Sequence, residues 1–297
     1  MSNMIVDFVK HHGGPTANID ITEAAITFRW IVFVIMALSG LGIYALSLTR
    51  KLNERAFHEL AAAVCITAAI SYFAMAADYG AVPVEVEYIR KGVLGKDWIK
   101  AGILHPTRSI WYVRYIDWTI TTPLLLLELA LASGLPLSQI FFLIFMDVVM
   151  IVTGLVGALI TSSYKWGFFV FGCLALFAIW FILLGSGRAS VARLGSDYSK
   201  AYMSSCLMLS GLWLLYPIAW ALSDGGNAIT PNSEMYFYGV LDVLAKPVYC
   251  IIHVLAIQKL DYSRLGWTKG SDGASAGLLS GNNQGANYGS TDARRGN

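Results

Sequence analysis

Three charged residues stand inside one apolar stretch of the chain, RYIDWTITTPLLLLE at 114–128. Charged groups at membrane depth are costly, so Arg114, Asp117 and Glu128 indicate a functional site with partners elsewhere. Asp117 and Glu128 are eleven residues apart, close to three helical turns, so both carboxyls lie on one helix face about 16 Å apart. Two buried acids at different depths are suited to moving a proton. The alternative is a pair of polar residues that face a water-filled groove.

A lysine stands inside a second apolar stretch, YGVLDVLAKPVYC at 238–250. Lys246 follows Asp242 by four residues, so the two lie on one helix face. A desolvated lysine amine becomes a nucleophile that can form a Schiff base with an aldehyde. A protonated Schiff base needs buried counterions, for which Asp117 and Asp242 are candidates. The alternative is a structural ion pair between Asp242 and Lys246.

Aromatic residues gather in a third apolar stretch, WLLYPIAW at 213–220. Trp213, Tyr216 and Trp220 share one helix face, and Pro217 predicts a kink. Together with Trp118 they could sandwich a flat apolar ligand. The alternative for each of them is ordinary packing or a belt at the membrane interface.

The composition places these stretches in a membrane. Of 297 residues, 56% are hydrophobic and 13% are charged, whereas a soluble domain carries about 25% charged residues. The net charge of +2 gives no case for nucleic acid, and the four cysteines lack metal-ligand spacing. We therefore predict an all-α membrane protein with seven transmembrane helices within 24–260. The apolar runs are approximately 21–48, 60–77, 110–132, 137–160, 166–184, 201–222 and 235–260.

The segments between and beyond these runs are polar. VPVEVEYI at 82–89, between the second and third runs, alternates and predicts a short β-hairpin over the membrane surface. The stretch 185–200 is predicted as a polar connection. Residues 1–23 are predicted to be an extracellular tail and 261–297, rich in Gly, Ser and Asn, a disordered cytoplasmic tail. Basic residues on the C-terminal side favour this orientation. They include Arg50, Lys51, Arg55, Arg188, Arg193 and Lys200.

The chain resembles the microbial (type 1) rhodopsins, and among them the fungal opsins related to the proton-pumping Leptosphaeria rhodopsin. The resemblance covers about 24–260, and the three stretches above match the family's third-helix, sixth-helix and retinal-lysine signatures. It implies that Lys246 holds all-trans retinal as a protonated Schiff base. Asp117 would be the primary counterion and proton acceptor, Asp242 the second counterion, and Glu128 the cytoplasmic proton donor. Arg114 would couple Asp117 to the exit.

Further roles follow from the same resemblance. Thr121 would hydrogen-bond Asp117, and Asp224 and Glu234 would match the extracellular proton-release acids. Asp147 would be a buried, satisfied structural carboxyl near the retinal ring. The residues implied to wall the retinal, with Tyr216 on the counterion side, are Trp118, Thr122, Met150, Gly154, Trp213, Tyr216, Pro217, Trp220 and Ala245.

The chain also departs from its relatives. Phe169 and Gly172 stand where archaeal pumps carry tryptophan and serine, and both changes could shift the absorption maximum. Glu128 replaces the aspartate of the archaeal and Leptosphaeria pumps, and glutamate also occurs at this position in a slow-cycling fungal opsin. His253, two turns beyond Lys246, is interpreted as a packed or solvated histidine, with a role in the cytoplasmic half-channel as the alternative.

The implied function is light-driven outward proton pumping in the plasma membrane, a transport activity and not an enzymatic one. The partners are membrane lipid and the transported proton, and a homo-oligomer is compatible with the sequence. The main alternative is a slow-cycling photosensor with little net transport. Lys246 argues against a retinal-free chaperone-like opsin, and Asp117 against a chloride pump, because it already places an anion where chloride would sit.

Overall fold

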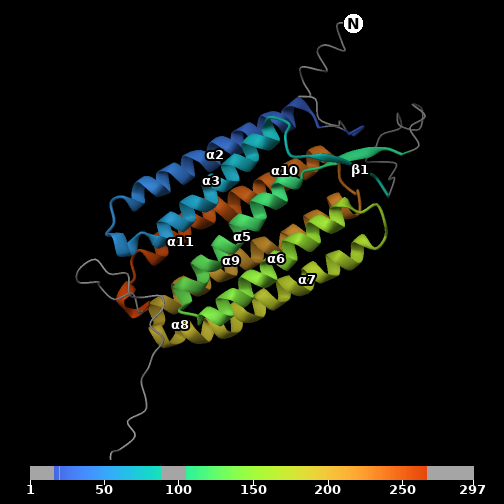
Figure 1. Cartoon of the computed structure of the whole chain (residues 1–297). Coiled ribbons are helices and arrows are strands. Elements are labelled where there is room, and N and C mark those ends of the chain that lie inside the picture. The colour runs from blue at the N-terminus through green and yellow to red at the C-terminus, as the bar shows by residue number, and fades with distance from the viewer. Residues whose placement is uncertain (1–16, 20, 88–104, 266–297) are drawn as a thin grey trace, which may run out of the picture.

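The structure, a computed structural model, describes residues 17–19, 21–87 and 105–265. Seven spans run side by side and reverse direction from one to the next, as Figure 1 shows. Four are single helices: α2 (Glu23–Ser47), α3 (Ala56–Ala76), α5 (Tyr112–Ser133) and α6 (Leu137–Leu159). The fifth combines α7 (Lys165–Phe181), η2 (Ile182–Gly187) and α8 (Arg188–Leu194). The sixth combines α9 (Ser196–Trp220) and η3 (Ala221–Gly225), and the seventh α10 (Pro231–Val243), η4 (Leu244–Val248) and α11 (Tyr249–Ile257).

All seven spans are long and apolar enough to cross a membrane, which confirms the predicted seven-helix bundle. The span with α5 is the least apolar of them and also the most enclosed by its neighbours. α2 and α6 are the least buried, and they turn many large apolar side chains outward. The costly charges of α5 are therefore shielded from lipid by the other helices.

A short hairpin covers one end of the bundle, as predicted. β1 (Val82–Glu85) pairs antiparallel with β2 (Thr107–Ile110), so that Val82 lies opposite Ile110 and Glu85 opposite Thr107. The second strand comes from just before α5 and lies outside the VPVEVEYI stretch. We call this the hairpin end of the bundle. At the opposite end lie the short helices η1 (Leu52–Glu54) and η5 (Tyr262–Leu265).

The prediction of a polar connection over 185–200 is wrong. The chain stays helical through η2 and α8, and α9 begins directly after Gly195. Buried residues recur at helical spacing, with Leu183, Gly187 and Val191 facing inward. The break at Gly195 has φ +129°, which side chains other than glycine rarely adopt. The residues beyond 265, like 1–16, 20 and 88–104, lie outside the described parts, and most of both predicted tails falls among them.

Two of the widened π-helical segments hold residues singled out by the sequence. η3 contains Asp224, which therefore belongs to the end of the sixth span and not to the following turn. η4 contains Lys246 followed by Pro247. Proline has no N–H to donate into the helix, and such widened turns often occur at functional sites.

Candidate functional site

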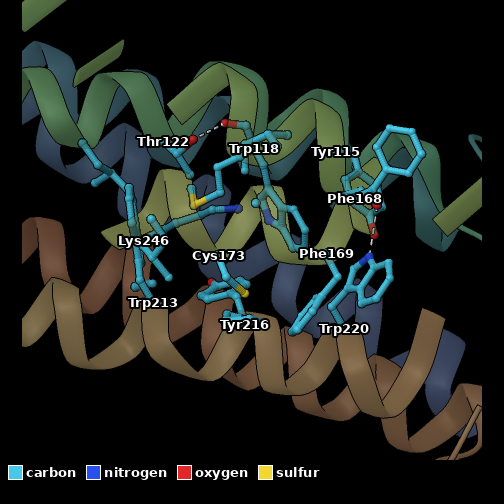
Figure 2. Close-up of a pocket in the computed structure, with 18 residues that line it drawn as sticks. Tyr115, Trp118, Thr122, Phe168, Phe169, Cys173, Trp213, Tyr216, Trp220 and Lys246 are labelled. Atoms are coloured by element: carbon cyan, nitrogen blue, oxygen red, sulfur yellow. Dashed lines mark hydrogen bonds between the residues drawn. The ribbon is translucent and has the colours of Figure 1, made fainter. Parts of the chain in front are cut away.

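A mostly apolar cavity of about 100 Å³ lies in the middle of the bundle. Figure 2 shows its walls, with Lys246 reaching in from the side opposite Trp220. All ten residues that the resemblance assigned to a ligand line this cavity. They are Trp118, Thr122, Met150, Gly154, Trp213, Tyr216, Pro217, Trp220, Ala245 and Lys246.

The cavity is also lined by residues that the sequence patterns above do not assign to a ligand. Phe169 and Gly172, noted above as departures, belong to the wall. Tyr115 and Leu125 were missed, although their spacing from Trp118 follows the helical period along α5 and could have revealed them. The others missed are Ile151, Phe168, Cys173 and Leu176, which lie on α6 and α7.

The polar end of the cavity is a buried cluster of one amine and two carboxylates. The Lys246 Nζ contacts Asp117 Oδ2 from α5 and Asp242 Oδ1 from α10, the latter at 3.2 Å. Each of these three residues is at most 2% exposed. The sequence spacing thus pointed to Asp117, Asp242 and Lys246, which the fold brings together from α5, α10 and η4.

The two carboxylates of this cluster differ in their hydrogen bonds. Tyr72 donates to one oxygen of Asp242 at 2.7 Å and Tyr216 to the other at 2.8 Å. Asp117 Oδ1, by contrast, has no hydrogen-bond partner among the described residues. Both oxygens of Asp242 therefore accept a hydrogen bond from a tyrosine, whereas one oxygen of Asp117 accepts none within the described chain.

Two threonines of α5 satisfy polar groups next to the cavity. The Thr121 hydroxyl donates to the backbone carbonyl of Asp117 at 2.9 Å, so its bond goes to the peptide oxygen and not to the carboxylate. Thr122 donates to Asp147 Oδ2 at 2.7 Å. Asp147 is fully buried, and its Oδ1 has no hydrogen-bond partner among the described residues.

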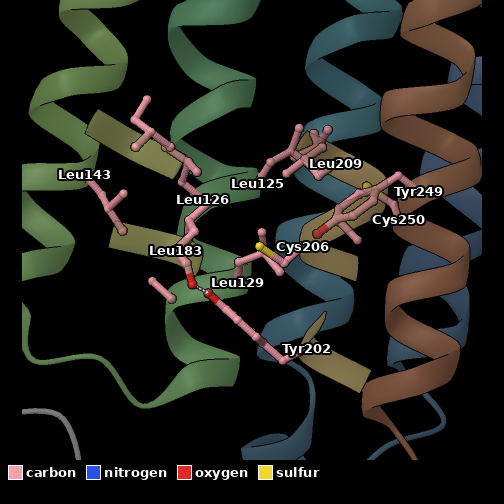
Figure 3. Close-up of a cluster of buried hydrophobic side chains, with 14 of the residues drawn as sticks. Leu125, Leu126, Leu129, Leu143, Leu183, Tyr202, Cys206, Leu209, Tyr249 and Cys250 are labelled. Carbon is pink, nitrogen blue, oxygen red and sulfur yellow. Dashed lines mark hydrogen bonds between the residues drawn. The ribbon is translucent and has the colours of Figure 1, made fainter. Parts of the chain in front are cut away.

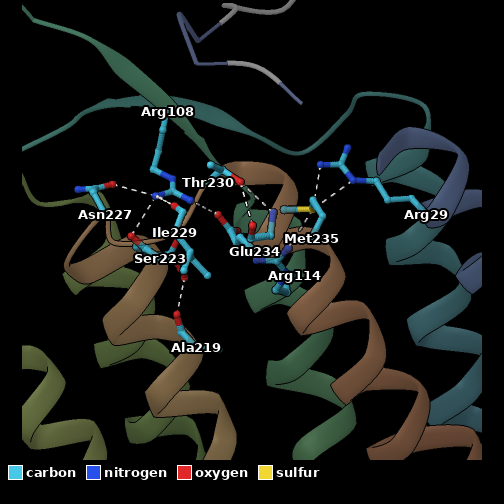
Figure 4. A network of polar contacts seen from close by, with 12 residues as sticks. Arg29, Arg108, Arg114, Ala219, Ser223, Asn227, Ile229, Thr230, Glu234 and Met235 are labelled. Atoms are coloured by element: carbon cyan, nitrogen blue, oxygen red, sulfur yellow. Dashed lines mark hydrogen bonds and ion pairs between the residues drawn. The ribbon is translucent and has the colours of Figure 1, made fainter. Parts of the chain in front are cut away.

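Glu234 is held between two arginines at the hairpin end, as Figure 4 shows. Arg114 lies 2.8 Å from one of its oxygens and Arg108 lies 2.7 Å from the other. All three side chains are at most 4% exposed. Each carboxyl oxygen of Glu234 is thus paired with one guanidinium group. Among the described residues, no hydrogen bond joins Arg114 to Asp117 directly.

Arg108 is a structural residue that no sequence pattern marked. From β2 it donates to Ser223 O, Asn227 Oδ1 and Ile229 O at 3.0 to 3.3 Å, besides Glu234. It thereby ties the hairpin to the connection between the sixth and seventh spans. Asp224 nearby accepts a hydrogen bond of 2.8 Å from the Tyr115 hydroxyl.

Glu128 lies in apolar surroundings toward the opposite end. It is fully buried, and neither of its carboxyl oxygens has a hydrogen-bond partner within the described chain. Leu125, Leu126 and Leu129 of the same helix belong to the largest buried apolar cluster. Such surroundings favour the neutral carboxylic acid, because burial penalises the charged form.

Comparison with known proteins places this geometry in context. The family model for bacteriorhodopsin-like proteins matches residues 23–260. Protein FDD123 of Trametes versicolor is 42% identical over 256 residues, which cover 86% of each chain. The opsin-like protein carO of Fusarium fujikuroi is 40% identical over 253 residues, covering 85% of this chain and 80% of that protein.

Solved structures show the same similarity. The light-driven proton pump from Leptosphaeria maculans gives a TM-score of 0.74 at 32% identity, covering 82% of this chain and 100% of that one. The light-driven proton pump rhodopsin of Coccomyxa subellipsoidea gives 0.73 at 34%, covering 80% and 98%.

The Arg108 cluster yields a stability prediction. Arg108→Met should lower the free energy of unfolding by about 3 kcal/mol, because Glu234 loses one buried partner and three oxygen acceptors lose their donor. Arg264→Met is the matched control, since the Arg264–Asp197 pair is half exposed and should cost less than about 1 kcal/mol. Unfolding of the purified protein in detergent measures both. Equal losses in the two variants would contradict the assignment.

Proposed function

Because this chain belongs to the bacteriorhodopsin-like family, the microbial rhodopsins, we propose that it is a light-driven outward proton pump. It would use all-trans retinal bound to Lys246 as a protonated Schiff base. The observation that carries the proposal is the pair of buried acids on α5, one on each side of the lysine. Asp117 contacts the amine, and Glu128 lies in the apolar core toward the opposite end. Two related solved structures are described as light-driven proton pumps.

The cavity fits the proposed chromophore. Its walls are apolar and aromatic, and Lys246 is the one amine among its lining residues. Trp118 and Trp213 lie on different helices, α5 and α9, and both line the space. When bound, retinal supplies light absorption and an isomerisation that drives the cycle. The remaining work is done by residues of the chain.

The outward half of the transfer starts at the lysine nitrogen. A proton on Lys246 Nζ passes to Asp117, because both oxygens of Asp242 already accept hydrogen bonds from tyrosines. The transfer neutralises the buried pair, and the proton then leaves toward the hairpin end. There both oxygens of Glu234 are already paired with arginines. Asp224, whose Oδ1 has no partner in the described structure, is the acid available for release.

The return of a proton to the Lys246 nitrogen depends on Glu128. This carboxyl is neutral at rest and gives its proton to the Lys246 nitrogen after Asp117 has taken the first one. The basic residues Arg50, Lys51 and Arg55 follow α2 at the opposite end, which favours the cytoplasm for that side. The hairpin end and the N-terminus then face outward, most simply across the plasma membrane. Net transport is therefore outward.

One observation favours a second candidate, a slow-cycling photosensor with little net transport. Glu128 is enclosed by leucines, and a donor with little access to water is replenished slowly. The two candidates share every residue and differ in the rate at which Glu128 regains its proton. The two candidates are distinguished by measuring how much proton is transported and how long one light-driven cycle lasts.

Illumination of retinal-supplied cells expressing the protein should acidify the medium. The acidification should vanish with a protonophore, because it reports proton movement and not metabolism. Lys246→Ala is the control: it should be colourless and show no light response. A coloured Lys246→Ala variant would refute the attachment site. A wild-type cycle lasting seconds without any external pH change would refute the pump.

Replacement of Glu128 tests the step in which the Lys246 nitrogen regains a proton. Glu128→Gln should slow reprotonation of the Lys246 nitrogen by at least about a hundredfold and make its rate fall as pH rises, since the proton must then come from solution. Asp147→Asn is the matched control, because it alters a buried carboxyl of a different helix, α6, whose Oδ2 accepts a hydrogen bond from Thr122. Flash photolysis at several pH values gives both rates. An unchanged rate in Glu128→Gln would show that another group is the donor.

A further inference from the structure

His253 of α11 is a buried titratable group that the mechanism above leaves unused. It is 0% exposed, and its Nδ1 lies 2.8 Å from the Ser205 hydroxyl of α9. Its Nε2 has no hydrogen-bond partner in the described parts of the chain. An imidazole that is buried with one nitrogen unsatisfied costs stability that an apolar side chain would not, so its presence calls for a functional reason.

Tyr249 connects His253 with the proposed donor Glu128. The two rings stack, with centroids 5.6 Å apart and planes inclined by only 10°. The Tyr249 hydroxyl has no hydrogen-bond partner among the described residues. Its ring belongs to the same buried apolar cluster as Leu125 and Leu129, which flank Glu128 on α5. Figure 3 shows the Tyr249 ring directed into the buried cluster that also holds Cys206 and Leu129.

An apolar plug separates His253 from the opposite end of the bundle. Phe57 packs edge-on against the imidazole at 6.2 Å, and Tyr262 packs against Phe57 at 5.6 Å. Ala132 and Ile257 belong to the same buried cluster as Phe57. His253 is therefore the polar group just inside this plug, with Tyr249 and Glu128 deeper in the bundle.

The chemistry of the side chains along this route singles out the histidine. Of these types of side chain, imidazole has the unperturbed pKa closest to neutral pH, whereas the unperturbed pKa values of thiols and of tyrosine lie higher. Its two ring nitrogens also allow a proton to enter at one and leave from the other.

We propose that His253 is the relay that returns a proton from the cytoplasm to Glu128. The proposal rests on the proposed pump function and adds the step that follows Lys246 reprotonation. The imidazole takes up one proton from the cytoplasmic side, and one proton moves by way of the Tyr249 hydroxyl to the Glu128 carboxylate. Glu128 becomes a neutral acid again, and His253 and Tyr249 return to their starting forms.

The test is His253→Phe, which keeps a ring to stack on Tyr249 and removes both nitrogens. Reprotonation of the Lys246 nitrogen should stay within about twofold of wild type, because it uses the proton already on Glu128. Recovery of the Glu128 C=O infrared band, and proton uptake seen by a pH-indicator dye, should slow by at least about tenfold. His253→Gln, which is polar but does not titrate, serves as a second variant and should show the same slowing.

Tyr202→Phe is the matched control, because it removes a buried hydroxyl of α9 that donates its hydrogen bond to the backbone oxygen of Leu183. It should leave uptake unchanged. Unchanged uptake in both His253 variants would overturn the relay, as would equal slowing in Tyr202→Phe. A shift of the dark Glu128 band in the histidine variants would mean that His253 only positions the donor, and would also overturn it. If wild type itself shows no light-driven uptake, the pump proposal fails first.

Discussion

The structure depends on one buried electrostatic cluster, in which the Lys246 amine lies between the carboxylates of Asp117 and Asp242. Removing such groups from water is expensive, and the cost is offset only by close pairing and by hydrogen bonds to the remaining oxygens. Tyr72 from α3 and Tyr216 from α9 supply those bonds to Asp242. Side chains from α3, α5, α9, α10 and η4 thus form one cluster around the Lys246 amine. The cluster leaves Asp117 with the oxygen that can take a proton.

The two halves of the bundle treat polar groups in opposite ways. At the hairpin end, Arg108 and Arg114 form buried ion pairs with the two oxygens of Glu234. At the opposite end, Glu128 and His253 lie among apolar side chains with polar atoms left without partners in the described chain. The bundle is therefore asymmetric, with buried ion pairs at the hairpin end and a buried carboxyl without a hydrogen-bond partner in the described chain, Glu128, toward the opposite end.

Periodicity and the cost of buried charge were enough to predict much of this arrangement. Asp117 and Glu128 were placed on one face of α5 because their spacing matches whole helical turns, and Asp242 with Lys246 by the same reasoning. Arg108 could not be found this way, since its partners lie more than a hundred residues away and depend on how the hairpin folds over the bundle. The helix that continues to Leu194 was not predicted, because the stretch 185–200 is polar in composition. The helical spacing of the buried residues Leu183, Gly187 and Val191 is hard to recognise in such a stretch.

The central claim is that the proton leaving the Lys246 nitrogen arrives on Asp117. Time-resolved infrared spectroscopy of the retinal-bound protein measures this directly. A carboxylic-acid C=O band should rise with the same time constant as deprotonation of the Lys246 nitrogen, and it should be absent in Asp117→Asn. The account would be contradicted if the wild-type protein showed no such band. It would also be contradicted if a band with the same time constant persisted in Asp117→Asn.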